Sequence, residues 1–368
     1  MANIEQQIAD VEAEIAKTDY NKATQQHIGR LKAKLARLRA EAEKRAAARG
    51  GGGRAFAVRK TGHATAALIG FPSAGKSTRL NNLANTRSEV AAYEFTTLDV
   101  IPGLLRHRHA EIQVLDLPGI VSGAAAGRGR GREVIAVARS SDLIIFVADV
   151  YTPDITPLAE ELRSAGIRLN ERPADIRITK TPRGGVQVRF AVPQTHLTEE
   201  YAQALVGEYG HTSAEVVVRQ DVTDEQLIDA LAGNRVYIPA VVALNKIDVA
   251  DADLMRRAHK VLKRWTVVDI SASRGQGIEK FKDVVYDRMD FIRVYLRPQG
   301  GEPDFKEPLI VKSRSTVLGV CNHIHRAWRT RFRYANVWGK SARFPGQTVG
   351  MDHVLEDEDI LTVVIRKG

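Results

Sequence analysis

The chain has 368 residues, of which 44% are hydrophobic and 27% charged, a composition that excludes a collagenous, wholly disordered or membrane-spanning protein. Its longest apolar runs, residues 143–148 and 238–244, are far shorter than the about 20 residues of a membrane span, and acidic residues interrupt the N-terminus where a secretory signal would be apolar. A formal net charge of +10 favours polyanionic partners, although a basic surface without such a partner is the alternative. Because Cys321 is the single cysteine, an intramolecular disulfide is excluded, and we expect a cytoplasmic protein with no membrane partner.

Residues 1–60 are expected to form a helical hairpin. Two apolar series at helical spacing flank the turn-prone residues 18–21. The series are Ile4, Ile8, Val11 and Ile15, followed by Ile28, Leu31, Leu35 and Leu38. Cations surround the second series and form either a solvated helix face or a contact with RNA or the ribosome. They are Arg30, Lys32, Lys34, Arg37 and Arg39.

The middle of the chain predicts an α/β domain with a parallel sheet. Short apolar runs, several of them separated by helical patterns, mark its strands. These runs are residues 64–69, 112–115, 143–147, 241–244 and 267–270. In such a sheet, ligands bind at the carboxyl ends of the strands.

One crossover of this domain is too long. The interval between Asp149 and Asn245 greatly exceeds the about 30 residues that a strand-helix-strand unit needs. We therefore predict an inserted small α/β subdomain at residues 166–235. Its alternating segments 176–180 and 186–190 predict a hairpin, and further expected elements are a strand at 215–219 and a helix capped by Thr223.

The remainder, residues 293–368, predicts a separate α+β domain with a mixed sheet. Its expected strands are residues 292–296, 309–311 and 360–365, and its expected helix spans residues 317–328. The acidic residues 357–359 are expected to form an exposed turn before the last strand.

A glycine-rich segment after the first strand has the pattern of a phosphate-binding loop. Two glycines five apart are followed by Lys76 and Ser77, and a helix can begin at Thr78, so backbone N–H groups would surround phosphates. Lys76 would reach the β- and γ-phosphates, and the Ser77 hydroxyl would bind Mg²⁺. The predicted segment is Gly70, Phe71, Pro72, Ser73, Ala74, Gly75, Lys76, Ser77 and Thr78.

Two further segments follow later strands of the predicted sheet. Asp116 can hold Mg²⁺, and the N–H of Gly119 can meet a γ-phosphate. Residues 245–248 contain Asn245, Lys246 and Asp248 and predict recognition of guanine. The Asp248 carboxylate can accept hydrogen bonds from the ring N–H and the exocyclic amine of guanine, and the Lys246 stem can cover the base. The last strand ends in Ser271, Ala272 and Ser273, where the Ala272 N–H can donate to the guanine carbonyl.

The order of these motifs resembles that of translation-factor-related GTPases. Residues 94–98, 123–132 and 134–142 are most similar to the Obg-related superfamily and, within it, to the developmentally regulated GTP-binding (DRG) family. The resemblance covers essentially the whole chain. It implies an N-terminal helical hairpin, a P-loop GTPase domain at residues 61–165 and 236–292, an inserted subdomain resembling part of a ribosomal small-subunit protein, and a β-grasp-like TGS domain at the C-terminus.

The resemblance also implies site residues and cofactors. Either Thr96 or Thr97, with Thr97 preferred, would bind Mg²⁺ and the γ-phosphate. The expected catalytic residues are Lys76, Thr97, Asp116 and Gly119. The expected Mg²⁺ ligands are Ser77, Thr97 and Asp116. Ile120 stands where signalling GTPases have a water-orienting glutamine, which predicts slow hydrolysis without help. Ser73 replaces the asparagine associated with potassium in related GTPases, so K⁺ stimulation stays open.

The sequence of the arginine-rich C-terminal domain is compatible with two roles for its aromatic residues. Its aromatic residues either stack on unpaired bases of RNA or form the domain core. They are Trp328, Phe332, Tyr334, Trp338 and Phe344. The resemblance implies a GTP- and GDP-binding GTPase that acts on ribosomes or RNA in translation with a regulatory protein partner. The alternatives are a nucleotide-gated binding module whose hydrolysis is a slow reset and, less favoured, an ATPase.

Overall fold

The computed structural model describes residues 4–19, 24–49, 62–71, 101–117, 131–325 and 327–366. The chain divides into two compact units, Met1–Ala55 with Gly166–Tyr237, and Phe56–Ala165 with Ile238–Gly368. No helix in the described ranges is both long enough and apolar enough to cross a membrane.

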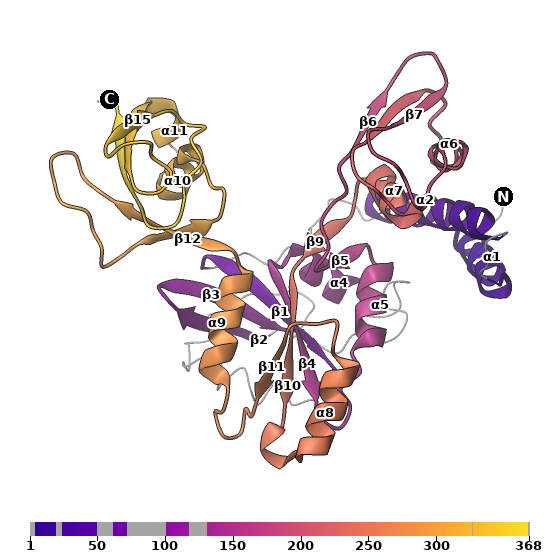
Figure 1. Cartoon of the computed structure of the whole chain (residues 1–368), viewed down its shortest axis with the longest axis horizontal. Helices are drawn as coiled ribbons and strands as arrows, with labels where there is room; N and C mark the ends of the chain where they lie inside the picture. Colours follow the sequence, from indigo (N-terminus) through magenta and orange to yellow (C-terminus); the bar gives the residue numbers. More distant parts are fainter. Residues whose placement is uncertain are drawn as a thin grey trace. The chain divides into compact units, whose positions relative to one another are not determined.

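The second unit contains a sheet with the strand order β11-β10-β4-β1-β3-β2 (Figure 1). Its strands are β1 (Ala64–Gly70), β2 (Ile101–His107), β3 (Ala110–Asp116), β4 (Leu143–Asp149), β10 (Ala240–Asn245) and β11 (Val267–Ile270). The predicted parallel arrangement holds for every described pair except β2 with β3, which is antiparallel. The sequence did not predict β2, because Pro102 and Gly103 interrupt its apolar run, but both residues are tolerated in an edge strand.

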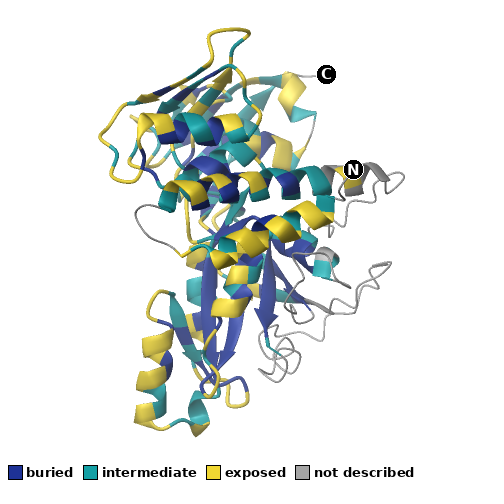
Figure 2. Cartoon of the chain, turned by 90° about the vertical axis from the view of Figure 1, so that its right-hand side faces the viewer, coloured by how far each residue is buried: buried dark blue, intermediate teal, exposed yellow. Residues whose placement is uncertain are grey.

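The central strands of this sheet are buried on both faces. Every residue of β1 and β4 is buried, and the sheet strands appear dark blue in Figure 2. Helix α9 (Ile278–Arg288) packs Phe281 and Val285 into a core cluster that includes Leu68 and Ile145. The other helical elements around it are α4 (Gly131–Ser140), α5 (Thr156–Ser164), η1 (Ile247–Val249) and α8 (Ala252–Val261). Because the faces are covered, the strand ends are left for ligand chemistry.

The C-terminal part of the second unit has a mixed sheet in the order β13-β12-β16-β14-β15. Its strands are β12 (Phe291–Leu296), β13 (Leu309–Lys312), β14 (Phe332–Trp338), β15 (Gln347–Val349) and β16 (Asp359–Ile365). The predicted single helix of residues 317–328 is wrong, since α10 (Val317–Ile324) and the short α11 (Trp328–Arg331) are separate. His325 ends α10 in an extended conformation with φ −160°, and its Nδ1 accepts a hydrogen bond from the Ala327 N–H at 3.1 Å.

The acidic turn at residues 357–359 is only partly exposed, which corrects the expectation for it. Asp359 is 0% exposed. Its carboxylate accepts hydrogen bonds from the backbone N–H of Ser341 at 3.2 Å and of Glu356 at 2.8 Å. Asp357 instead binds the guanidinium of Arg293 at 2.7 Å. Two of the three carboxylates therefore fix the entry into β16.

The first unit combines the N-terminal helices with the inserted residues. It contains α1 (Ile4–Lys17), α2 (Gln25–Arg49), β5 (Ile167–Leu169), β6 (Ile176–Lys180), β7 (Val186–Phe190), α6 (Glu199–Glu208), β8 (Ala214–Val218), α7 (Asp224–Ala232) and β9 (Val236–Ile238). Thr223 caps α7 through a capping box with Gln226, as predicted. The predicted hairpin of β6 with β7 is wrong, because β8 lies between them. The alternate residues Ala214, Val216 and Val218 of β8 are all buried, and this burial places β8 at the centre.

Helix α2 packs into the core of the inserted segment. Ala33 and Ala36 belong to the same buried cluster as Tyr201 of α6. Lys32 pairs with Glu225 at 2.9 Å, and Arg37 donates to the Glu208 carbonyl at 2.7 Å. Some of the α2 cations therefore stabilise this unit internally.

Candidate guanine nucleotide site

The predicted site residues at strand ends meet at one edge of the parallel sheet. Asp116 is paired in register with Leu68, two residues before Gly70. Asn245 lies opposite both Asp149 of β4 and Ile270 of β11. Parallel strands end at the same edge of a sheet, so segments that are distant in the sequence converge there.

Gly70 is required by the close approach of β1 to β4. A Cβ atom on Gly70 would lie 2.5 Å from the backbone oxygen of Val147, a distance that real Cβ atoms do not adopt. The first glycine of the predicted phosphate loop therefore lets the chain leave the sheet alongside β4. Phe71 is the last described residue of this segment.

Asn245 joins the last two strands of the site. It is 1% exposed, and its Oδ1 accepts a hydrogen bond from the Ala272 N–H at 3.2 Å. The Asn245 side chain therefore positions the 271–273 segment and is shielded from solvent. Ser271 adds to this order, since its hydroxyl accepts a hydrogen bond from the Arg274 N–H at 3.2 Å.

Lys246 adopts the left-handed backbone conformation, with φ 64°. Its ammonium forms an ion pair with the carboxylate of Asp149, which is itself buried and accepts a hydrogen bond from the Tyr151 N–H at 3.0 Å. This pair fixes the end of the lysine stem beside the strand ends. Asp149 was not among the predicted site residues, although it directly follows the apolar run 143–148, and the end of a predicted strand was the available signal in the sequence.

Asp248 has a half-enclosed carboxylate with hydrogen-bond donors around it. Its side chain is 11% exposed, and the Ser273 hydroxyl and Arg274 Nε lie 3.4 Å and 3.5 Å from its Oδ2. A hydrogen bond from Ser271, with smaller contributions from Arg274 and Ser273, outweighs desolvation and lowers the pKa of Asp248. The carboxylate is therefore ionised at neutral pH and can accept two N–H donors from one base edge.

Asp116 lies at the end of β3 and is 7% exposed. The following residue, Leu117, donates its N–H to the Leu68 carbonyl at 3.2 Å, so the chain after Asp116 stays beside β1. A carboxylate oxygen is a hard ligand of the kind that Mg²⁺ prefers, and Asp116 fits a magnesium site at this edge.

Three protein-family models match this chain. The family model described as 50S ribosome-binding GTPase matches residues 65–180, the C-terminal region of that domain matches residues 183–291, and the TGS domain model matches residues 292–365. The developmentally-regulated GTP-binding protein 1 of Xenopus laevis is 44% identical over 361 residues, which cover 97% of this chain and 98% of that protein. The chain belongs to the DRG family of GTP-binding proteins.

Two further relatives match over nearly their whole length. An uncharacterized GTP-binding protein of Methanocaldococcus jannaschii is 51% identical over 367 residues, covering 99% of this DRG-family chain and 93% of that protein. A Saccharomyces cerevisiae protein named ribosome-interacting GTPase 1 is 43% identical over 370 residues, covering 99% and 100%. The fold is accordingly a P-loop GTPase domain followed by a TGS domain.

Part of the predicted site of this DRG-family chain lies outside the described residues. The structure describes Gly70, Phe71, Asp116, Asn245, Lys246, Asp248 and the 271–273 segment. The predicted residues outside it are Pro72, Ser73, Ala74, Gly75, Lys76, Ser77, Thr78, Thr96, Thr97, Gly119 and Ile120. The guanine side of the predicted site is therefore described, and most of its phosphate side is not.

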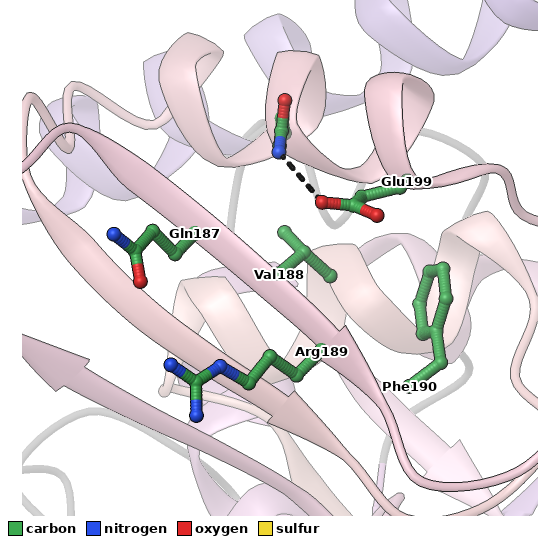
Figure 3. Close-up of a pocket in the computed structure, with 6 residues that line it drawn as sticks. Gln187, Val188, Arg189, Phe190 and Glu199 are labelled. Carbon is green, nitrogen blue, oxygen red and sulfur yellow. Dashed lines mark hydrogen bonds between the residues drawn. The ribbon is translucent and has the colours of Figure 1, made fainter.

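A hollow of about 490 Å³ lies elsewhere, between β7 and α6 in the first unit (Figure 3). Three of its polar side chains have partners. Arg189 pairs with Glu215 at 3.5 Å, and Glu199 accepts a hydrogen bond from Gln203 at 3.2 Å. None of the predicted nucleotide-binding residues lines this hollow, so it is separate from the strand-end site.

Proposed function

We propose that the chain binds GTP and GDP through the strand-end site and hydrolyses GTP to GDP and phosphate. One observation carries the proposal: the ionised, half-enclosed carboxylate of Asp248 lies beside the 271–273 segment that Asn245 holds in place. A carboxylate and a backbone N–H placed in this way match the donor and acceptor edges of guanine. Adenine lacks that pattern, which disfavours an ATPase.

The described residues have distinct roles in this proposal. Asp248 accepts the ring N–H and the exocyclic amine of guanine, and the Ala272 N–H donates to the guanine carbonyl. The Lys246 stem covers the base while Asp149 holds its ammonium. Asn245 positions Ala272, and Gly70 lets the phosphate loop begin beside β4.

The phosphate side rests on residues predicted from the sequence. Gly75, Lys76 and Thr78 would hold the phosphates, and Ser77, Thr97 and Asp116 would bind Mg²⁺. When bound, Mg²⁺ neutralises the charge that develops on the phosphates. Gly119 would meet the γ-phosphate, whereas Ile120 orients no water, so the intrinsic rate is slow, and K⁺ remains a candidate activator.

We further propose that GTP binding controls an interaction with ribosomes or RNA in the cytoplasm, in support of translation. The net charge of +10 supports a polyanionic partner, and one relative is named a ribosome-interacting GTPase. A regulatory protein partner fits the slow hydrolysis. Ile120 also favours the second candidate function, a nucleotide-gated assembly module in which hydrolysis only resets the cycle.

Base recognition is tested by Asp248→Asn. The amide that replaces the carboxylate can donate to the extra carbonyl of xanthine, so preference should shift from guanine towards xanthine nucleotides. Competition of GDP and XDP against a fluorescent nucleotide measures the shift. Asp253→Asn, which changes an exposed carboxylate of α8, is the matched control and should leave both affinities unchanged. Unaltered GDP affinity in Asp248→Asn would refute the assignment.

The partner is tested by cosedimentation with ribosomal subunits in the presence of a non-hydrolysable GTP analogue or GDP. Nucleotide-dependent cosedimentation is expected, and equal, negligible recovery in both states would contradict the ribosome proposal. Single-turnover hydrolysis with and without ribosomes then separates the two candidates. Strong acceleration indicates a ribosome-stimulated GTPase, and an unchanged slow rate indicates the assembly module.

A further inference from the structure

The two faces of the C-terminal sheet differ sharply. Alternate residues of β14 and β16, such as Ala335, Val337 and Leu361, point into the core beneath α10. Trp328 and Phe332 pack against that same core, so the structure assigns these two aromatic residues a packing role. The intervening positions of β14, Tyr334 and Trp338, lie outside the cluster.

On the face opposite this core, the sheet forms a shallow cup of about 320 Å³. Its walls include Trp338 with Arg297 and, four residues back along β14, Tyr334. Asn336 and Thr362, which are paired in register, lie between them. A volume at the small end of ligand sites, which span about 300–1,000 Å³, suits one flat group rather than a folded ligand.

One wall of the cup is a preformed stacking surface. The Arg297 guanidinium lies over the Trp338 ring, with its Cζ 4.8 Å from the ring centroid. Two contacts hold this pair in place. Arg297 Nε donates to the Gly301 carbonyl at 2.8 Å, and the Gly346 backbone packs so closely on the indole that a Cβ there would be 3.2 Å from Trp338 Nε1. Such a pair needs little ordering before a base stacks on it.

The cup carries positive charge. Arg297 lines it, and none of the other described residues that line it is charged. The Arg333 guanidinium lies over the Tyr334 ring, with its Cζ 5.8 Å from the ring centroid, and neither arginine forms an ion pair with a carboxylate among the described residues. Flat stacking surfaces next to such arginines complement the bases and phosphates of an unpaired nucleic acid strand.

The polar side chains of Asn336 and Thr362, between the walls of the cup, already donate hydrogen bonds to the backbone. Asn336 Nδ2 donates to the Gly346 carbonyl at 3.2 Å, and the Thr362 hydroxyl donates to the Arg297 carbonyl at 2.9 Å. These two donors are engaged with the backbone, whereas Asn336 Oδ1 is buried and has no hydrogen-bond partner among the described residues. Affinity would therefore come mainly from stacking and charge, and Asn336 Oδ1 is the acceptor through which a base edge could be read.

We propose that this cup, formed by Arg297, Trp338 and Tyr334, binds one unpaired nucleotide of single-stranded RNA by stacking. The proposal rests on the RNA or ribosome role given above and identifies the place of contact. It requires a single-stranded ligand, because the faces of paired bases are covered by their neighbours in a duplex.

The test measures the binding of the full-length protein to a fluorescein-labelled single-stranded RNA 12-mer by anisotropy. Trp338→Leu and Tyr334→Leu should each weaken binding roughly 10- to 100-fold, as loss of a stacking partner does. Trp338→Phe should restore most of the affinity, because it retains an aromatic ring. Phe305→Leu removes an aromatic ring that is 60% exposed outside the cup, and it should change affinity less than about twofold.

Salt dependence separates stacking from charge. Trp338→Leu removes no cation, so it should leave the slope of log affinity against log salt unchanged. Arg333→Gln, which removes the guanidinium over Tyr334, should reduce the magnitude of that slope by about 0.7 if this guanidinium meets one phosphate of a single strand. Thermal melts and GDP affinity show whether each variant remains folded.

The outcomes are distinguishable. Wild-type affinity in folded Trp338→Leu and Tyr334→Leu variants, equal losses in Phe305→Leu, or equal affinity for an RNA duplex would each overturn the cup proposal. If ribosome cosedimentation persists in that case, the proposed function stands and its contact lies elsewhere. If the wild-type protein binds neither the 12-mer nor ribosomes, both proposals fail.

Discussion

Asn245 and Ala272 are joined by a hydrogen bond of 3.2 Å between the side-chain oxygen of one residue and the backbone N–H of the other, although 27 residues separate them in the chain. Asn245 is the last residue of β10, and Ala272 lies just beyond β11. The bond makes the loop after β11 depend on the loop after β10, so that both sides of the proposed guanine pocket are held together.

Asn245→Ala should weaken guanine nucleotide binding. It leaves the buried Ala272 N–H without its acceptor, which costs about 1–3 kcal/mol, and it frees the 271–273 segment. We expect GDP affinity, measured with a fluorescent nucleotide, to fall by a similar free energy. Asn322→Ala, at an exposed position of α10, is the control. Equal affinities of Asn245→Ala and the wild type would show that this bond does not organise the pocket.

Gly70→Ala should destabilise the GTPase domain. The new methyl group would meet the Val147 carbonyl at 2.5 Å, and because that atom belongs to the backbone of β4, the end of β1 must move. We expect a loss of about 1–3 kcal/mol in urea unfolding, together with weaker nucleotide binding. Gly350→Ala, where a Cβ has no neighbour within 4 Å, should have little effect. Comparable effects of the two substitutions would contradict the close approach of the strands.

Gly29→Ala and Gly207→Ala should change stability in opposite directions. A Cβ on Gly29 would lie 1.5 Å from the hydroxyl of Tyr201, a residue that is 4% exposed, so α2 must separate from α6. We expect a net loss of about 1–3 kcal/mol. Gly207 lies exposed in α6 with open space around it, and alanine there should add up to about 1 kcal/mol through helix propensity. Urea unfolding of both variants measures the difference, and a stabilised Gly29→Ala would show that α2 does not pack as described.

Asp357→Asn should lower the stability of the C-terminal domain at neutral pH. Burial alone would raise the pKa of Asp357, but hydrogen bonds and charge from Arg293 outweigh it, and the folded-state pKa is lowered. The stabilisation is therefore present above the unfolded value of about 3.9 and is lost as pH falls through the lower folded value. Because the pair is partly exposed, we expect about 1 kcal/mol or less.

Urea unfolding at pH 7 and pH 3 checks this dependence. The difference between Asp357→Asn and the wild type should shrink at the lower pH, because the wild-type carboxylate begins to be protonated there. Glu358→Gln is the comparison. The Glu358 carboxylate contacts only the Arg293 guanidinium, at 2.9 Å, whereas the Asp357 carboxylate also accepts the Arg293 backbone N–H at 2.8 Å, so the effect of Glu358→Gln should be smaller. A difference that grows towards pH 3 would contradict the sign of the shift.

The sequence predicted what depends on local pattern. The parallel strands are apolar runs, and the motifs after them contain glycines, carboxylates and amides in a recognisable order, so the GTPase fold could be expected. The TGS fold was expected from the family resemblance, since the local pattern predicted only an α+β domain with a mixed sheet. The order β6-β8-β7 could not, because the turn at residues 181–185 favours a hairpin while the burial of Val216 in β8 decides the pairing. Asp359 was misjudged for a similar reason, since its partners at Ser341 and Glu356 are set by the tertiary fold. The ion pair of Lys246 with Asp149 likewise joins two strands that no local pattern connects.

The packing of α2 on α6 and α7 imposes an order of events during synthesis of the chain. Lys32 and its partner Glu225 are 193 residues apart, so at about 5–20 residues per second the helix is made roughly 10–40 seconds before its docking surface. All the strands from β1 to β4 leave the ribosome during that interval. Ala33 and Ala36 lack their native packing partners for as long, so the core of this unit can close only after the inserted segment has emerged.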